Sequence, residues 1–204
     1  MKTIIYPTYF PSIAHFSAVV NSQYLELEVE DNFQKQSYRN RCLIYSPNGV
    51  QLLNVPVVHS KNIRQKTKDV KISYDFDWQK QHFKSLEMAY RSSPFFEFYE
   101  SEFEPLFQKK TKFLLDLNIE IFELLLKCLL LKKEYSQSVE FFKNLPDYND
   151  YRYLTQDKKT NYKFEPYTQV FEDKFGFINN LSVIDLIFAE GKYAVNYLEN
   201  IKIL

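Results

Sequence analysis

The chain has 204 residues, of which 45% are hydrophobic, so it can bury one proper core and is too short to require two domains. Its 26 basic and 26 acidic residues leave no formal net charge, which argues against bulk binding of nucleic acid, because that usually requires a strongly basic domain. With only three glycines, it lacks the glycine-rich phosphate loops of dinucleotide-binding and P-loop proteins. We expect one domain over residues 1–204.

Cysteine content and apolar runs indicate the compartment. The two cysteines, Cys42 and Cys128, favour a reducing cytoplasm over a disulfide framework. The apolar start is interrupted at Pro7 and is too short for a signal peptide. The strongest apolar run, Leu124–Leu131, is far shorter than the roughly 20 residues of a membrane-spanning helix. These features predict a soluble, cytoplasmic protein without a membrane span.

The amino-terminal segment has the pattern of a strand, a helix and a second strand. Thr3–Tyr6 is β-branched and aromatic, and Ser12 is placed to cap a helix over Ile13–Val20. Tyr24–Glu30 alternates apolar and acidic residues, which is typical of a half-exposed strand. This order predicts a parallel βαβ unit.

The next segment has the pattern of a hairpin. Leu43–Tyr45 and Val50–Val58 are apolar runs, and Ser46–Gly49 supplies the turn residues between them. A basic connection, Lys61–Lys71, then leads to a short predicted strand at Val70–Ser73.

From Asp77 onward the pattern becomes mainly helical, with Asp77 and Ser182 as capping residues and Gly191 as a stop. We expect helices over Trp78–Tyr90, Phe95–Phe107, Lys112–Lys132, Val183–Glu190 and Tyr193–Ile201, a short amphipathic piece over Tyr135–Phe142, and an irregular segment over Asn144–Pro166. The fold class is therefore predicted to be α+β, with a mixed β-sheet from the amino-terminal part packed against a helical carboxyl-terminal part.

Polar side chains gather in the stretch that precedes the hairpin. Asp31, Lys35, Asn40 and Arg41 lie here beside the predicted sheet. Arginine offers a planar fork of donors to carboxylate or phosphate, so we interpret Lys35, Asn40 and Arg41 as a clamp for an anionic or polyhydroxyl ligand. Arg39 points to the opposite face if this part is extended and is left out. The alternative is that these charges only solvate an edge and its turn.

His82 is the main candidate for a general acid or base, because histidine titrates near neutrality. Asp31 is a candidate to orient it or to bind a sugar hydroxyl, and Tyr90 lies eight residues further along the same predicted helix. Ligands of open α/β sheets bind at the carboxyl ends of the strands, which adds Tyr9. The alternative for His82 is a histidine that only connects helix and sheet by hydrogen bonds.

Other chemistry has less support. Cys42 follows Arg41 and falls on the opposite face of an extended chain, which weakens a nucleophilic role. The three histidines and two cysteines have no zinc-site spacing, so we expect neither a metal nor another cofactor.

Several short motifs follow one another in the order of a known family. They are Pro7-Thr8-Tyr9-Phe10-Pro11, Lys35 with Asn40-Arg41-Cys42, Asn48-Gly49, Val55-Pro56-Val57, Trp78 with His82, Ala89-Tyr90, Pro94-Phe95-Phe96, Leu117-Asn118 and Leu181–Leu186. Over nearly its whole length the chain resembles the WbqC-like family of bacterial proteins. The resemblance implies a link to surface-polysaccharide (O-antigen) gene clusters, for which transfer of glycine to a sugar is one suggested role. It brings no established catalytic residues.

Two functions follow from the residues and the resemblance together. The first is a group transferase that moves a glycyl, aminoacyl or related acyl group from an activated donor to an amino sugar or nucleotide sugar. His82 and Asp31 would be its catalytic residues, and Tyr9, Lys35, Asn40, Arg41 and Tyr90 would bind the substrate. The second is a non-catalytic sugar or nucleotide-sugar binder, or an interaction subunit of a polysaccharide-assembly complex.

Overall fold

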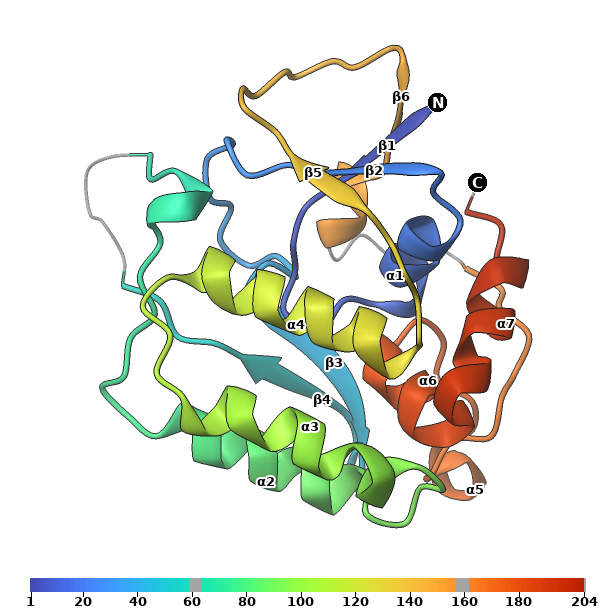
Figure 1. The fold of residues 1–204 in the computed structure, drawn as a ribbon. Helices are drawn as coiled ribbons and strands as arrows, with labels where there is room; N and C mark the ends of the chain where they lie inside the picture. The colour runs from blue at the N-terminus through green and yellow to red at the C-terminus, as the bar shows by residue number, and fades with distance from the viewer. Residues whose placement is uncertain (59–63, 157–161, 204) are drawn as a thin grey trace.

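A four-stranded parallel sheet forms the upper part of the molecule in Figure 1. Its strands, in spatial order, are β5 (Tyr135–Gln137), β2 (Tyr24–Leu27), β1 (Lys2–Ile5) and β6 (Tyr148–Asp150). The computed structural model describes residues 1–58, 64–156 and 162–203.

The predicted βαβ unit is confirmed. Helix α1 (Ile13–Val20) connects β1 to β2, and the two strands pair in parallel with Ile5 opposite Leu27. The Ser12 side chain accepts a hydrogen bond from the His15 backbone N–H and caps the helix. The second strand is shorter than predicted, because regular pairing ends at Leu27.

The outer strands β5 and β6 differ from the prediction. They lie in the segments that we expected to be an amphipathic piece and an irregular connection. Each strand has three residues, which is too short for alternation to show in the sequence. Their partners β2 and β1 supply the hydrogen bonds that make them strands.

The hairpin forms a sheet of its own from β3 (Arg41–Ser46) and β4 (Gly49–Asn54). Gly49 has a φ of 92°, which the turn requires and a glycine adopts without strain. The strand predicted at Val70–Ser73 is reduced to isolated bridges, such as that between Val57 and Ile72, because no regular strand lies next to it. Part of the basic connection, residues 61–63, lies outside the described residues.

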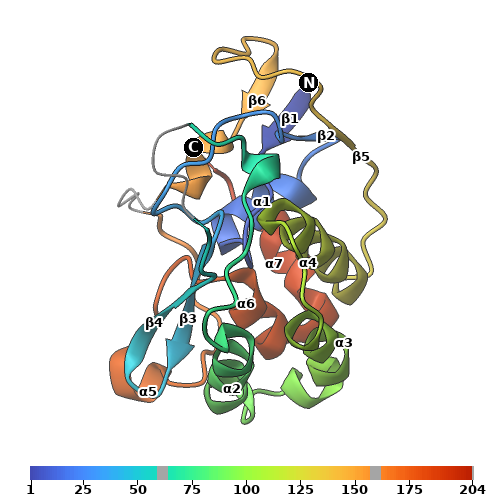
Figure 2. The same cartoon turned by 90° about the vertical axis from the view of Figure 1, so that its left-hand side faces the viewer.

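The helices predicted from Asp77 onward occur in the predicted order, and one further helical turn, at Glu172–Phe175, was not predicted. They are α2 (Trp78–Tyr90), α3 (Phe96–Gln108), α4 (Leu114–Cys128), the single turn α5 (Glu172–Phe175), α6 (Val183–Glu190) and α7 (Ala194–Asn200), with short 3₁₀ turns at Thr67–Asp69, Arg152–Thr155 and Gly191–Tyr193. The predicted caps are confirmed, since the Asp77 side chain accepts from Lys80 N–H and that of Ser182 from Ile184 N–H. Figure 2 shows α2 beside the hairpin and α4 nearer the parallel sheet.

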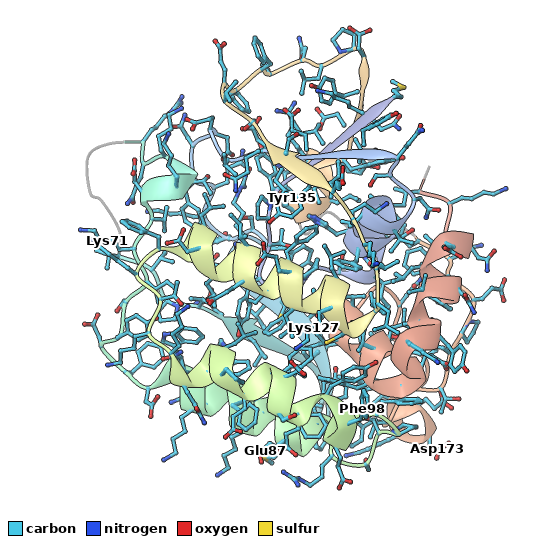
Figure 3. The ribbon with its side chains drawn as sticks, viewed as in Figure 1. Lys71, Glu87, Phe98, Lys127, Tyr135 and Asp173 are labelled. Atoms are coloured by element: carbon cyan, nitrogen blue, oxygen red, sulfur yellow. The ribbon has the colours of Figure 1, made fainter. Side chains whose placement is uncertain are left out.

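The fold class is α+β, as predicted, although two of its strands come from the second half of the chain. Side chains fill the space between α4, the hairpin and the lower helices (Figure 3). Aromatic rings such as Phe103 and Phe188, with centroids 5.2 Å apart, form much of this core. Within the described ranges, no helix has the length and apolar character needed to cross a membrane.

Candidate active site

The carboxyl ends of the parallel strands form one edge of the sheet, and the candidate site lies there. Because β1 pairs in parallel with β2 on one side and with β6 on the other, the chain leaves all three strands at this edge. The strand order reverses at β1, and in open parallel sheets ligands bind outside the carboxyl ends at such a reversal. The segments that follow these strands therefore start at the same edge; they are residues 6–11 after β1, 28–31 after β2 and 151–152 after β6.

A buried ion pair lies at this edge. Arg39 Nη2 is 2.5 Å from Asp31 Oδ2, and the Thr67 hydroxyl donates to the other Asp31 oxygen. The two charged side chains are 0% and 3% exposed, and the guanidinium lies 3.8 Å from the ring centroid of Tyr6. Arg39 is thus buried against Asp31, and the geometric reason for leaving it out of the predicted clamp was wrong. Residues 35–40 form turns instead of an extended strand, so the alternation on which the exclusion relied does not apply.

A second buried pair is also near enough to Tyr6 to affect its pKa. Arg152 Nη1 is 3.4 Å from Glu28 Oε2, and its Nη2 is 2.6 Å from the Asp150 carboxylate. Burial raises the pKa of Tyr6, and the negative charge of Asp31 adds to the effect. We call Tyr6, Glu28, Asp31, Arg39 and Arg152 the ionic cluster.

Most of the ionic cluster was absent from the sequence prediction. Glu28 continues an alternating pattern that predicts an exposed side chain, but the strand ends one residue earlier and the carboxylate is buried. Arg152 lies in the segment predicted to be irregular. Of Glu28, Arg39 and Arg152, only Arg39 could have been suspected from the sequence, because it stands among other polar residues near Asp31.

A second cluster joins the loop after β1 to helix α2. The Tyr9 hydroxyl lies 2.8 Å from His82 Nδ1, and the ring centroids of Trp78 and His82 are 5.1 Å apart. Trp78 and His82 are four residues apart on α2, so they share a helix face. Tyr9 and Trp78 are each 1% exposed and His82 is 7% exposed. We call these three residues the imidazole cluster.

Burial determines the protonation of the imidazole cluster. Burial lowers the pKa of His82 to about 4, so the ring is neutral near pH 7. The pKa of Tyr9 is raised well above its usual value, first by burial and then by Cys42. The Tyr9 hydroxyl therefore stays protonated. In the tautomer in which it donates to Nδ1, the ring proton of His82 lies on Nε2. Tyr9 thus holds the position next to the imidazole that we expected for Asp31.

Backbone contacts connect the two clusters. The Asn118 side chain, from α4, donates to the carbonyl oxygens of Pro7 and Arg39 at 3.2 and 2.8 Å. The Tyr9 backbone N–H donates to the carbonyl oxygen of Tyr38. Among the described residues, the buried Thr8 hydroxyl and the Trp78 indole N–H have no protein partner. Such groups are rare in a packed interior; Trp78 belongs to the imidazole cluster, and Thr8 precedes Tyr9 in the chain.

Asn40 and Arg41 form a separate group at the base of the hairpin. Their side chains donate to the same Asn54 oxygen, over 3.2 and 3.1 Å. Side chains alternate along a strand, so Arg41 lies on the face opposite Cys42, whereas Cys42 is near enough to Tyr9 to affect its pKa. Asn40 and Arg41 therefore do not join the imidazole cluster.

Lys35 and Tyr90 also lie apart from the imidazole cluster. Lys35 is exposed on a turn and, within the described residues, makes no ion pair. The Tyr90 hydroxyl accepts a hydrogen bond from the Tyr45 backbone N–H and lies near the buried Asp185, whose charge adds to the effect of burial in raising the pKa of Tyr90. Tyr90 thus holds α2 against β3. Burial also raises the pKa of Cys42, which disfavours a thiolate.

The family model of the WbqC-like protein family matches residues 6–163. The chain belongs to the WbqC-like family. In this WbqC-like protein the ionic and imidazole clusters both lie within the matched stretch, whereas α5, α6 and α7 lie outside it. No curated protein and no solved structure matches the chain.

Two buried histidines should make the stability of the protein depend on pH. Burial lowers the pKa of His15 and of His82 from 6.5 to about 4. Between these values the unfolded chain binds a proton at each histidine and the folded protein does not. We therefore expect the free energy of unfolding to fall as the pH drops from about 7 to 4, by up to roughly 3 kcal/mol for each histidine.

Urea unfolding at pH 7, 6 and 5 checks this expectation. In a His82→Gln variant, the free energy of unfolding should fall less steeply as the pH drops. If the unfolding free energy of the variant falls with pH as steeply as that of the parent protein, His82 does not contribute to the pH dependence.

Proposed function

We propose that the protein is a group transferase that places a glycyl, aminoacyl or related acyl group on an amino sugar or nucleotide sugar in surface-polysaccharide biosynthesis. The observation that carries the proposal is the neutral His82, in contact with Tyr9 of the loop that follows β1. His82 is the most exposed member of the imidazole cluster, so it is the one that a ligand reaches first. Membership of the WbqC-like family supports the assignment to polysaccharide synthesis.

The low pKa of His82 changes the role that we assign to it. A base with a pKa of about 4 has little capacity to remove a proton from an amine near neutral pH. A neutral imidazole that accepts at Nδ1 instead presents Nε2–H as a donor. We assign this donor to the carbonyl oxygen of the acyl group, where negative charge develops during the reaction.

The transfer step then balances without a further reactant. The amine nitrogen of the sugar attacks the acyl carbon, and the new C–N bond forms. The bond between that carbon and the oxygen or sulfur of the donor breaks, and the proton lost by the amine ends on this leaving group. The donor must arrive activated, as an ester or thioester, because the chain has no glycine-rich ATP-binding loop.

Arg41 remains a candidate for the anionic part of a nucleotide sugar, whereas Asn40 is buried and its amide nitrogen donates to Asn54 and to the Val55 carbonyl oxygen. Arg41 uses Nε to bind Asn54, and its outer guanidinium nitrogens have no partner among the described residues. Guanidinium donors suit phosphate oxygens. Because Arg41 lies on the outer face of the hairpin, it would bind a part of the ligand away from the reacting amine.

A second candidate function is a sugar or nucleotide-sugar binder without catalysis. The weak basicity of His82 favours it, because an imidazole N–H donor can hold a sugar oxygen without taking part in proton transfer. Mass spectrometry distinguishes the two. The protein is incubated with UDP-amino sugars and with glycyl-tRNA or glycyl thioesters, and a glycyl mass increase on the sugar supports transfer. Binding of the UDP-amino sugar without added mass would favour the second function.

A further inference from the structure

Strand β4 has a free edge on the side away from β3. In an antiparallel pair, opposite residues alternate between those that exchange backbone hydrogen bonds and those that do not. The bond from Val55 N–H to the Asn40 carbonyl oxygen places these two in the bonded class. Counting along the register, the pairs Leu43–Leu52 and Tyr45–Val50 belong to the other class, and their backbone groups point outward.

The outward groups of β3 are covered. The Leu43 carbonyl oxygen accepts from Ser182 N–H, and Tyr45 N–H donates to the Tyr90 hydroxyl. On β4, within the described residues, the backbone groups of Val50, Leu52 and Asn54 have no such partner. The free edge therefore offers a row of donors and acceptors spaced for one more strand.

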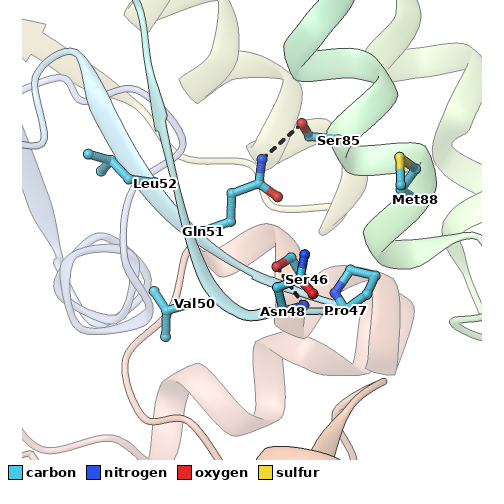
Figure 4. Close-up of a pocket in the computed structure, with 8 residues that line it drawn as sticks. All are labelled: Ser46, Pro47, Asn48, Val50, Gln51, Leu52, Ser85 and Met88. Atoms are coloured by element: carbon cyan, nitrogen blue, oxygen red, sulfur yellow. Dashed lines mark hydrogen bonds between the residues drawn. The ribbon is translucent and has the colours of Figure 1, made fainter.

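A groove lies between this edge and helix α2 (Figure 4). Helix α2 packs against β3, and β4 is the outer strand of the hairpin, so a strand added to β4 would lie over the groove. Gln51 points toward α2 and bonds Ser85 at 3.0 Å, whereas Val50 and Leu52 point away. The groove has a volume of about 510 Å³ and is also lined by Met88, which is 63% exposed.

We propose that the β4 edge and the adjoining groove bind an extended peptide of a partner protein by strand addition. The peptide backbone pairs with Val50, Leu52 and Asn54. Its alternate side chains enter the groove beside Met88, and the others extend the apolar face formed by Val50 and Leu52, which are 50% and 49% exposed. The matching peptide has apolar residues on the face that continues Val50 and Leu52. On the alternate positions it has side chains that suit a groove lined by Ser46, Asn48, Gln51 and Ser85 as well as Pro47 and Met88.

A second copy of this chain fits the groove less well. Edge pairing of two β4 strands would direct only residues such as Gln51 and Leu53 toward α2. Leu53 is 2% exposed in its own core, and Gln51 is bonded to Ser85. The groove would stay unfilled, whereas a peptide brings side chains that are free to enter it.

Selection from a displayed library of random seven-residue peptides tests the proposal, with fluorescence polarisation on the selected peptides. We expect N-methylation of alternate peptide residues to weaken binding at least tenfold, and N-methylation of the intervening residues to have little effect. This alternation is specific to strand addition, because only every second N–H faces the edge.

The variant Leu52→Pro provides the complementary test. It removes an outward N–H and leaves the ladder with β3 intact, as edge strands tolerate. We expect at least tenfold weaker binding with an unchanged circular dichroism spectrum, whereas Leu52→Val should bind normally. Failure to select a peptide, equal effects of both methylation patterns, or equal binding to Leu52→Pro would overturn the proposal. Self-association that Leu52→Pro abolishes would also overturn it, in favour of a second copy at this edge.

Discussion

Replacement of Arg39 by alanine is expected to lower the free energy of unfolding by about 3–5 kcal/mol, because it leaves Asp31 buried without its counter-ion. The carboxylate would keep only the Thr67 hydroxyl, and the face of Tyr6 would lose the guanidinium that covers it. Urea unfolding followed by tryptophan fluorescence, which reports on Trp78, measures the change.

Arg91→Ala is the matched control for Arg39→Ala. Arg91 also pairs with carboxylates, Glu87 at 2.7 Å and Glu100 at 3.2 Å, but its side chain is 55% exposed. Exposed pairs contribute little, so this variant should stay within about 1 kcal/mol of the parent protein. Replacing both members of the buried pair, with Arg39→Met and Asp31→Asn, should recover part of the loss. Equal stability of the two alanine variants would contradict the assigned role of the ionic cluster.

His82→Ala should reduce the rate of acyl transfer by about 10²–10³-fold, as expected for loss of one donor to a developing oxyanion. Tyr9→Phe should cause a smaller loss, since the imidazole remains but its tautomer is no longer held by the hydroxyl. Because burial lowers the pKa of His82 to about 4, its contribution should be constant from about pH 8 to 5.5 and should change only nearer pH 4. Timed mass spectrometry of the acylated sugar measures each rate.

Tyr99→Phe is the control for Tyr9→Phe. Its hydroxyl is also buried and donates to a backbone carbonyl oxygen, that of Cys128, but it lies outside the imidazole cluster. It should lower stability slightly and leave the rate unchanged. Turnover by His82→Ala at the parent rate would remove His82 from the mechanism, and a ratio of the parent rate to the His82→Ala rate that rises steeply between pH 6 and 7 would indicate a general base instead of a neutral donor.

The geometry divides the predicted site residues by what each can do. Tyr9 and His82 share a cluster. Asn40 and Arg41 share Asn54 on another face of the hairpin, and Lys35 remains exposed. A ligand that touches both groups must therefore be long, which a nucleotide sugar is.

Much of this protein follows from local sequence. The caps Ser12, Asp77 and Ser182 begin helices where predicted, because a side-chain oxygen satisfies backbone N–H groups wherever the helix lies in the fold. The hairpin turn follows from Gly49 and its neighbours for the same local reason. The family was also recognisable from its motifs, and the family model confirms it.

Only the tertiary structure decided the rest. Strands β5 and β6 form because β2 and β1 provide their hydrogen-bond partners. A segment of three residues is too short for its own sequence pattern to predict a strand. The turns between Asp31 and Arg39 bring these two side chains into contact. Arg152 contacts Glu28, which lies 124 positions earlier in the chain. Burial lowers the pKa of His82, and burial depends on every element packed around it. Local chemistry therefore specified where the capped helices begin and where the hairpin turns, whereas long-range contacts determined the outer strands, which polar groups are paired and what they can do.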